Sequence, residues 1–397
     1  MSKEQCNFCG SVYDTSVDKN ILLSSQDDKY LICDSCIEFA YENINELKQD
    51  KKKNTVIFKS PKDIKELLDK YIIGQELAKR RLSTAIYNHS KVITDKTIEK
   101  SNILLIGPTG SGKTAMLKAI SKEFNMPLYI EDVSSLTSAG YEGKSASDIL
   151  KGLLKFTDYD LEKAESAIVL LDEGDKIACN TSDINKKDVN GKGAQQSILK
   201  LVEGATFNID MNGQNVSINT ENIIFILAGA FNGIEDIIAK RQKTKASVNG
   251  FLLPAENISN KYNEYILNVT SEDIKEYGFI EEFIGRFPII TPLQQLTEDD
   301  LFNILKSSKN SILEQTINLF KLDDIELVFT DEAIRKIAKK ALKHKTGARA
   351  LRTIIENIVE NAKYECPNSN IKKVIIQEDL RCNYILKTLK EKAVFKS

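Results

Sequence analysis

The sequence predicts an α/β fold built around a parallel β-sheet, preceded by a small cysteine-rich module and followed by a mainly helical domain. Four cysteines lie before residue 48, and helical patterning dominates after residue 293. Between these regions, short apolar runs alternate with segments of helical patterning, at residues 101–106, 127–132, 167–171 and 222–228. This alternation is typical of a parallel sheet that is covered by helices on both faces.

The composition limits the classes of function. The chain has 397 residues, which is enough for two or three domains with a sizeable core. Its net charge of −2 gives no bulk electrostatic attraction to nucleic acid or to an anionic membrane. No apolar run approaches the ~20 residues of a membrane span, and the N-terminal MSKEQCNFCG lacks the features of a signal peptide. We therefore expect a cytoplasmic protein without a membrane partner, and nucleic acid is not an expected partner.

The N-terminal cysteines form two C-x₂-C pairs: Cys6, Cys9, Cys33 and Cys36. Two such pairs can close a tetrahedral thiolate site around Zn²⁺, and Gly10 allows the chain to turn after the first pair. Two disulfides are the alternative, which a cytosolic setting disfavours. We expect residues 1–48 to form a zinc-binding module whose folding depends on the metal, and residues 49–60 to form a charged linker. The mixed charge of the module favours contacts with proteins over contacts with DNA.

Capping signals mark the starts of several helices. Ser60 is an expected N-cap with Pro61 at the first helical position. Thr297 and Thr330 are each followed by acids in the first turn, which predicts two further helices. Two short strand candidates lie among the helices of the C-terminal part, at Ile325–Phe329 and Lys373–Ile376.

The first of the apolar runs ends in the motif G-x-x-x-x-G-K-T, and apolar residues resume at helical spacing from Met116. The motif consists of Gly107, Pro108, Thr109, Gly110, Ser111, Gly112, Lys113 and Thr114. Its glycines let backbone N–H groups face an anion, and the following helix adds the positive end of its dipole. Lys113 can reach the β- and γ-phosphates, and the Thr114 hydroxyl can bind Mg²⁺. We expect this loop and Met116 to bind ATP or another nucleoside triphosphate.

A second apolar run, Ala167–Leu171, ends in the acids Asp172 and Glu173. The run is too short for a typical helix and suits a strand that is buried on both faces. Acids at the C-terminal end of a parallel strand lie where open α/β sheets bind their ligands. We expect Asp172 to hold Mg²⁺ through water and Glu173 to act as the general base on the attacking water.

Together these motifs resemble the ClpX family of AAA+ unfoldases, from Cys6 to about Ile376. The resemblance is carried by the four cysteines and by GPTGSGKT (107–114), AGYEGKS (139–145), LDEGDKI (171–177), GAQQSILKLVEG (193–204), FIGRFP (283–288) and KTGARALR (345–352). It implies a homo-hexameric ring that hydrolyses ATP, threads proteins through its pore and delivers them to a ClpP-type peptidase. It also implies an AAA+ P-loop NTPase domain at residues 61–293 and a small AAA+ lid domain at residues 294–397.

The same resemblance implies roles for three residues of the nucleotide site. Ile73 lies in a segment similar to the one that packs on adenine. Arg286 resembles the arginine finger that enters the neighbouring subunit's site, where a guanidinium neutralises charge on the transferred phosphoryl group. Arg349 resembles the second sensor, which reaches from the lid domain to the γ-phosphate.

Further roles concern substrates and partners. Tyr141 lies between two glycines and resembles the pore-loop aromatic that grips polypeptide. Gly250 and Phe251 stand where the family has the tripeptide that docks into the peptidase, although Asn249 replaces its aliphatic residue. The zinc module is implied to receive substrate and adaptor proteins. Gly174 replaces a bulky apolar residue of the family, which predicts a looser end of the acid-bearing strand.

Two other classes of function remain open. A chaperone of this kind could disassemble complexes without a peptidase. A nucleic-acid motor could share the phosphate loop, but the chain lacks the basic stripe that such a motor uses.

Overall fold

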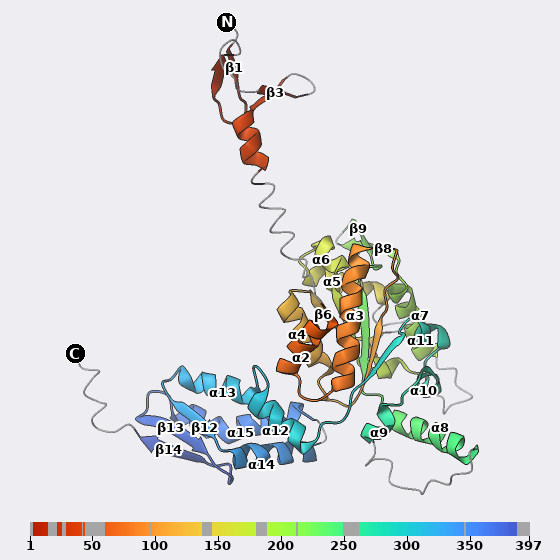
Figure 1. The fold of residues 1–397 in the computed structure, drawn as a ribbon, viewed down its shortest axis with the longest axis vertical. Helices are drawn as coiled ribbons and strands as arrows, with labels where there is room; N and C mark the ends of the chain where they lie inside the picture. Colours follow the sequence, from red (N-terminus) through yellow and green to blue (C-terminus); the bar gives the residue numbers. More distant parts are fainter. Residues whose placement is uncertain are drawn as a thin grey trace, which may run out of the picture. The chain divides into compact units, whose positions relative to one another are not determined.

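The computed structural model divides the chain into two compact units, Met1–Ile57 and Phe58–Ser397. It describes residues 3–14, 22–25, 29–41, 43, 60–95, 97–136, 145–179, 189–211, 213–248, 262–344 and 347–386. Figure 1 labels the helices and strands of both units.

The first unit is built from two small antiparallel hairpins. In one, β1 (Lys3–Gln5) pairs with β2 (Val12–Asp14), and in the other, β3 (Leu22–Ser24) pairs with β4 (Leu31–Cys33). Gly10 has a φ of +79°, and its N–H donates to the carbonyl of Cys6 at 2.9 Å. The expected turn after the first cysteine pair is therefore present, in a conformation that suits glycine.

The second unit contains a five-stranded parallel sheet with the order β11-β5-β10-β7-β6. Its strands are β5 (Ile103–Ile106), β6 (Leu128–Asp132), β7 (Ile168–Asp172), β10 (Ile224–Gly229) and β11 (Ile289–Pro292). The four predicted strands are confirmed within two residues at each end. The sequence did not reveal β11, a four-residue strand that ends in proline.

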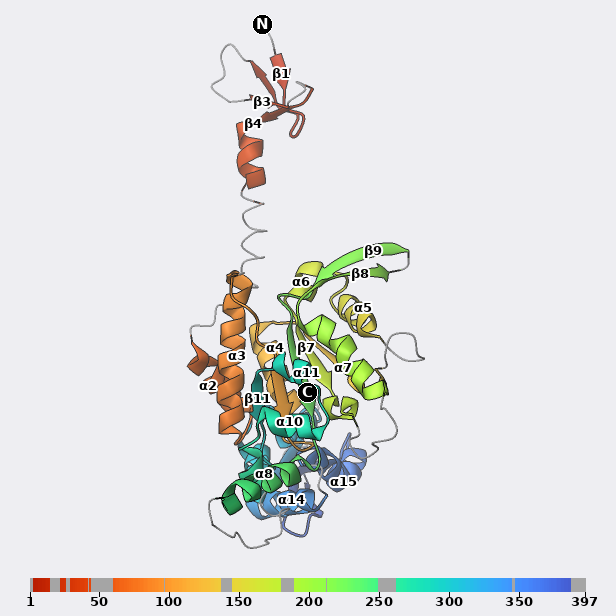
Figure 2. The same cartoon turned by 90° about the vertical axis from the view of Figure 1, so that its right-hand side faces the viewer.

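Helices cover both faces of this sheet, as predicted. They are α2 (Pro61–Tyr71), α3 (Glu76–Thr94), α4 (Lys113–Phe124), α5 (Ala146–Phe156), α6 (Leu161–Glu165), α7 (Val189–Val202), α8 (Ile234–Val248), α9 (Tyr262–Ile266), α10 (Ser271–Tyr277) and α11 (Glu281–Gly285). Figure 2 shows α2 and α3 on one side of the sheet and α5 and α7 on the other. The central strands β5, β7 and β10 are almost entirely buried between these layers.

Short elements complete this part of the chain. Two 3₁₀ turns follow strand ends, at Val133–Ser135 and Gly174–Ile177. A hairpin of β8 (Thr206–Met211) and β9 (Gln214–Asn219) projects beside α5 and α6 (Figure 2). This hairpin was not predicted from the sequence.

The C-terminal region has its own hydrophobic cores and lies at the lower left of Figure 1. Its elements are α12 (Glu298–Ser307), α13 (Ile312–Lys321), β12 (Glu326–Phe329), α14 (Asp331–Lys343), α15 (Arg349–Glu365), β13 (Ile371–Ile376) and β14 (Cys382–Leu386). The two predicted strands are present as β12 and β13, and β14 joins them in a three-stranded sheet. The region is mainly helical, as the sequence predicts.

The predicted helix starts are confirmed at atomic detail. The Ser60 side chain accepts a hydrogen bond from the N–H of Asp63, and Pro61 is the first helical residue. Thr297 and Asp300 form a reciprocal capping box, and Thr330 accepts from the N–H of Ala333. Among the described residues, no helix combines the length and apolar character that a membrane span requires.

Candidate functional site

The phosphate loop connects β5 to α4 at the C-terminal edge of the sheet. Gly107 leaves the strand with its N–H bound to the carbonyl of Gly229, at 3.2 Å, on the neighbouring strand. A Cβ at Gly107 would lie 2.7 Å from the Cβ of Leu293, so no larger residue fits there. Gly112 caps α4 with a φ of +105°, which glycine adopts without strain. The loop therefore leads directly into the N-terminus of α4, where backbone N–H groups can receive phosphate oxygens.

Lys113 lies within this loop and directs its ammonium group onto the loop's own carbonyls. Its Nζ donates to the carbonyl oxygens of Gly107 at 2.6 Å and Pro108 at 3.1 Å. Burial lowers the pKa of Lys113 to about 8, while the negative charge of Asp172 acts in the opposite direction. A bound triphosphate would further favour the charged form of Lys113.

The two acids expected to act in hydrolysis lie at the end of β7, an inner strand of the sheet between β10 and β6. Asp172 is half-buried, and its Oδ1 accepts the N–H of Glu173 at 3.0 Å. Glu173 is exposed and has a φ of +56°, a left-handed conformation that is uncommon outside glycine. Local strain of this kind often accompanies functional positions.

The end of β7 is closely packed, so the looser strand end expected from Gly174 is wrong. Gly174 is buried, and a Cβ there would lie 2.6 Å from both Cγ and Cδ1 of Leu227 on β10. The next acid, Asp175, accepts the N–H of Ala230 at 3.1 Å. The Leu227 side chain occupies the space that a larger residue at 174 would need, and Asp175 ties the acid-bearing turn to the end of β10.

The segment expected to pack on adenine lies between α2 and α3, beside the phosphate loop. Ile73 is half-buried, and its neighbour Ile72 is buried with its Cγ2 4.0 Å from the position of a Cβ at Gly112. The Met116 Cε lies at the same distance from that position. Ile72 and Met116 therefore pack beside the start of α4, next to the segment that contains Ile73.

The C-terminal region closes the other side of the site. Gly347 has a φ of +55°, and a Cβ there would lie 3.0 Å from the carbonyl oxygens of Thr109 and Gly110. The N–H of Ala348 donates to Gly110 at 3.3 Å, and α15 begins at the next residue, Arg349. The Arg349 charge is near enough to lower the pKa of Lys113. A small pocket separates the loop from this region, lined by Pro108, Thr109, Gly110, Ser111, Gln295, Leu296, Leu342 and Gly347.

Arg286 lies at the opposite edge of the sheet from the phosphate loop. Its carbonyl accepts the side-chain amide of Asn102 at 3.0 Å, next to the first residue of β5, whereas the loop follows the last residue of β5. The strand alone separates these ends by about 10 Å. The guanidinium is 52% exposed, and its Nη2 lies 2.9 Å from the Glu203 carboxylate. The Arg286 side chain therefore lies at the surface and away from the phosphate loop of its own chain.

Three of the residues expected to meet substrate or peptidase, Tyr141, Gly250 and Phe251, lie outside the described residues. Two polar residues that contact predicted site residues or the phosphate loop were not predicted from the sequence. Gln75 contacts both the phosphate loop and the segment after β11, and Glu203 binds Arg286. Gln75 follows the Ile72-Ile73-Gly74 segment directly, but no spacing rule pointed to its partners.

The cysteine cluster fits a tetrahedral zinc site. The four sulfur atoms lie within 4.8 Å of one another, with 3.9 Å between Cys6 and Cys36 and 3.7 Å between Cys9 and Cys33. Sulfurs that share one Zn²⁺ at a Zn–S distance of ~2.3 Å are separated by roughly 3.8 Å. All four are free thiols, which argues against the two disulfides. The N–H of Cys9 lowers the pKa of the Cys6 thiol, whereas burial raises the pKa of the Cys36 thiol in the same cluster.

Replacement of Cys33 by Ser is expected to unfold the N-terminal module and leave ATP hydrolysis largely in place. The reason is that the two small hairpins have little core besides the cysteine cluster, so metal binding supplies the folding energy. Zinc content and ATPase activity of the Cys33→Ser variant should be compared with those of Cys382→Ser, whose thiol lies in the C-terminal region. Zinc-free protein after purification without chelator would contradict the assignment.

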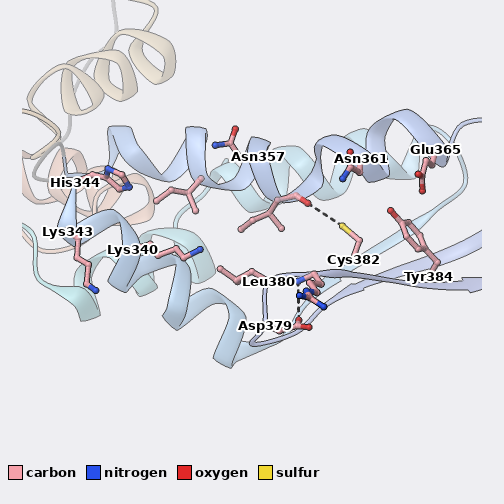
Figure 3. A pocket seen from close by; sticks show the side chains of 13 residues that line it. Lys340, Lys343, His344, Asn357, Asn361, Glu365, Asp379, Leu380, Cys382 and Tyr384 are labelled. Atoms are coloured by element: carbon pink, nitrogen blue, oxygen red, sulfur yellow. Dashed lines mark hydrogen bonds between the residues drawn. The ribbon is translucent and has the colours of Figure 1, made fainter.

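A second groove, of about 1050 Å³, lies within the C-terminal region (Figure 3). Lys340 and Lys343 of α14 stand at one end, and Asn357 and Asn361 follow one ridge of α15. Cys382 on β14 donates to the carbonyl of Ile358 at 3.3 Å. No residue of the phosphate loop lines this groove. This groove is therefore separate from the small pocket at the phosphate loop.

Known proteins resemble the chain over both regions that form this site. A family model described as AAA domain (Cdc48 subfamily) matches residues 98–290. A second, described as the C-terminal, D2-small domain, of ClpB protein, matches residues 296–370. The ATP-dependent Clp protease ATP-binding subunit ClpX of Bacteroides thetaiotaomicron is 38% identical over 399 residues, which cover 95% of each chain.

Proposed function

The chain belongs to the ClpX family of AAA+ proteins, and from this premise we propose that it threads folded proteins through the pore of a homo-hexameric ring. Family membership makes the chain an ATPase and an ATP-dependent AAA+ chaperone. The ring, the threading and the delivery of substrates to a ClpP-type peptidase are our proposals. We also propose a cytoplasmic location, where thiols stay reduced and available to zinc.

The observation that carries the proposal is the division of the nucleotide site between two edges of the sheet. The charges of Asp172 and Arg349 act on Lys113 of the phosphate loop, whereas Arg286 is exposed at the opposite edge. A subunit of this kind completes its site only when a neighbour supplies the arginine. A head-to-tail contact repeated around an axis closes into a ring.

Each site residue has a role in hydrolysis that follows from its chemistry. The loop N–H groups and Lys113 bind the β- and γ-phosphates, and Ile73 and Met116 contact the base. Thr114 and Asp172 would hold Mg²⁺, which supplies neutralising charge on the phosphate oxygens. Glu173 accepts a proton from the water that attacks the γ-phosphorus, while the bond from that phosphorus to the ADP oxygen breaks. Arg349 and the neighbour's Arg286 offset the negative charge on the transferred group.

We assign four parts to the chain in this mechanism. Residues 1–48 form the zinc module, residues 49–60 the linker, residues 61–293 the ATPase domain and residues 294–397 the lid. The exposed aromatic side chains of the zinc module, Phe8, Tyr30, Phe39 and Tyr41, suit the binding of substrate or adaptor proteins. Tyr141 is proposed to grip the substrate, because a tyrosine gives a large contact area at low entropic cost.

The partner beyond the ring is proposed to be a ClpP-type peptidase, as the name of the Bacteroides relative indicates for that protein. Gly250 and Phe251 are the proposed docking residues, with Phe251 as the apolar anchor. Asn249 is polar and poorly suited to an apolar cleft, which weakens the expected docking.

Replacement of Tyr141 or of Phe251 by alanine is expected to separate substrate unfolding from delivery to the peptidase. Tyr141→Ala should hydrolyse ATP at least as fast as the parent but fail to unfold a stable reporter, because the pore loop loses its aromatic contact with the substrate polypeptide and no longer holds it during ATP hydrolysis. Phe251→Ala should unfold the reporter but lose its degradation by added ClpP-type peptidase. ATPase, unfolding and degradation are measured together, with Tyr364→Ala, which removes an exposed C-terminal tyrosine, as the control. Undiminished degradation by Phe251→Ala would favour a chaperone that acts without a peptidase.

A further inference from the structure

The connector between β11 and the C-terminal region runs alongside the phosphate loop. The N–H of Leu293 donates to the carbonyl of Ile106 at 2.7 Å, at the strand end from which the loop starts. The following residues, Gln295 and Leu296, line the same small pocket as the loop itself. The capping box of α12 begins at Thr297, so any shift of the connector moves the first helix of the C-terminal region.

Gln75 joins this connector to the phosphate loop through its side-chain amide. Its Nε2 donates to the carbonyl of Gln294 at 2.8 Å, and its Oε1 accepts the N–H of Gln294 at 2.9 Å. The same Nε2 donates to the carbonyl of Ser111 at 3.3 Å. The Gln75 carboxamide therefore bonds the N–H and the carbonyl of Gln294 in the connector and the carbonyl of Ser111 in the loop.

The backbone at Gln75 is held in an unusual conformation that aims this amide. Gln75 has a φ of 58° and is only 6% exposed. A non-glycine residue in the left-handed region costs of the order of a hydrogen bond, so surrounding contacts must hold it. The preceding Gly74 also has a positive φ, and a Cβ there would lie 3.4 Å from Oδ1 of Asp300 on α12. The turn before α3 is thus fixed between the loop and the C-terminal region.

The contact with Ser111 bears directly on phosphate binding. The carbonyl of Ser111 and the N–H of Gly112 belong to one planar trans peptide, so they point in opposite directions. An amide that anchors the carbonyl also fixes the direction of the Gly112 N–H at the start of α4. Phosphate accepting from that N–H polarises the peptide and makes the Ser111 carbonyl a stronger acceptor for Gln75. The distance of 3.3 Å between Gln75 Nε2 and the Ser111 carbonyl oxygen is longer than that of a typical hydrogen bond, so this bond can shorten when phosphate binds.

A second side-chain amide makes the same pairing one residue further along the connector. Asn263 of α9 donates its Nδ2 to the carbonyl of Gln295 at 3.0 Å and accepts the N–H of Gln295 at 2.6 Å. Both of these bonds go to the connector, and neither goes to the phosphate loop. Gln75 and Asn263 thus each pair a side-chain amide with the backbone of one connector residue, and of these two residues Gln75 also bonds the phosphate loop.

We propose that Gln75 is a positioning residue that transmits phosphate binding at the loop to the connector and so to the C-terminal region. This inference rests on the proposed function, because a motor needs such a transmission to convert ATP binding into movement. Only a neutral carboxamide serves here. A glutamate at position 75 would still accept the N–H of Gln294. Its carboxylate would have no hydrogen to donate to the carbonyl oxygens of Gln294 and Ser111 and would repel them.

The test is hydrogen exchange of the connector peptide, residues 289–297, in the full-length zinc-loaded protein with and without ATPγS. In the parent, ATPγS should slow this exchange. In Gln75→Ala and Gln75→Glu the ratio between the two states should fall to about one at a saturating concentration of ATPγS, which fluorescent ATP binding establishes for each variant. Asn263→Ala should speed exchange by about tenfold in both states, since two bonds are lost, and keep the ratio.

Two results would overturn the transmission role. One is an unchanged ATPγS ratio in both Gln75 variants. The other is a parent connector that does not respond to ATPγS at all. Reporter unfolding by the parent is measured in parallel, because it depends on the proposed function and not on Gln75. A parent that responds to ATPγS but unfolds nothing would remove the proposed function and leave the transmission by Gln75 supported.

Discussion

Glu173→Gln is expected to abolish ATP turnover while leaving ATP binding intact. The general base on the attacking water is lost, and such bases contribute ~10²–10⁴-fold to rates, which is ~3–5 kcal/mol of barrier. Glutamine has the same shape and adopts the same left-handed backbone as Glu173, so the turn at the end of β7 should persist. The phosphate loop is unchanged by this substitution.

Phosphate release and fluorescent ATP binding are the two measurements for this variant. Glu162→Gln, which neutralises an acid on α6 away from the loop, controls for the change in charge. The variant should keep the parent's affinity and release phosphate at least about a hundredfold more slowly. Near-parental hydrolysis would show that the base is another residue.

Arg286→Ala is expected to abolish hydrolysis in a homogeneous ring, because no site then receives a neighbour's guanidinium. An arginine finger is worth ~10³–10⁵-fold in the rate of phosphoryl transfer. Arg335→Ala is the matched control, since Arg335 is 53% exposed and pairs with Asp299 at 3.0 Å in much the same way as Arg286 pairs with Glu203.

Mixing subunits tests whether the arginine acts across the interface. Neither Arg286→Ala nor Glu173→Gln should hydrolyse ATP alone. In an equal mixture, about a quarter of the sites should combine an intact base with an intact neighbouring arginine and regain activity. An inactive mixture, or a fully active Arg286→Ala ring, would place the arginine finger elsewhere.

Local signals in the sequence predicted much of this fold. The run ending at Ile106 and the run ending at Asp172 became central strands, because continuous apolar residues suit strands buried on both faces. The caps at Ser60, Thr297 and Thr330 were also predicted, since capping depends on residues within one turn. β11 and the β8–β9 hairpin were missed, because pairing with distant strands, rather than local pattern, defines them.

The site was predictable where a motif reports on local geometry and not where distant residues meet. The phosphate loop follows from glycine spacing, whereas Gln75 and Gln294 are separated by 219 positions and meet only in the folded chain. The looser strand expected at Gly174 was wrong for the same reason, because Leu227 on another strand fills the space. The roles of Tyr141 in substrate gripping and of Phe251 in peptidase docking stay predictions.

Unfolding of a stable folded reporter with an unstructured tail tests the central claim most directly. Reporter fluorescence is followed with excess parent protein, a trap for unfolded chains, and either ATP or ATPγS. We predict that fluorescence falls with ATP and not with ATPγS, and that Glu173→Gln behaves as the parent does with ATPγS. Stable fluorescence in a sample that hydrolyses ATP and carries zinc would contradict the assignment of this chain as a protein unfoldase.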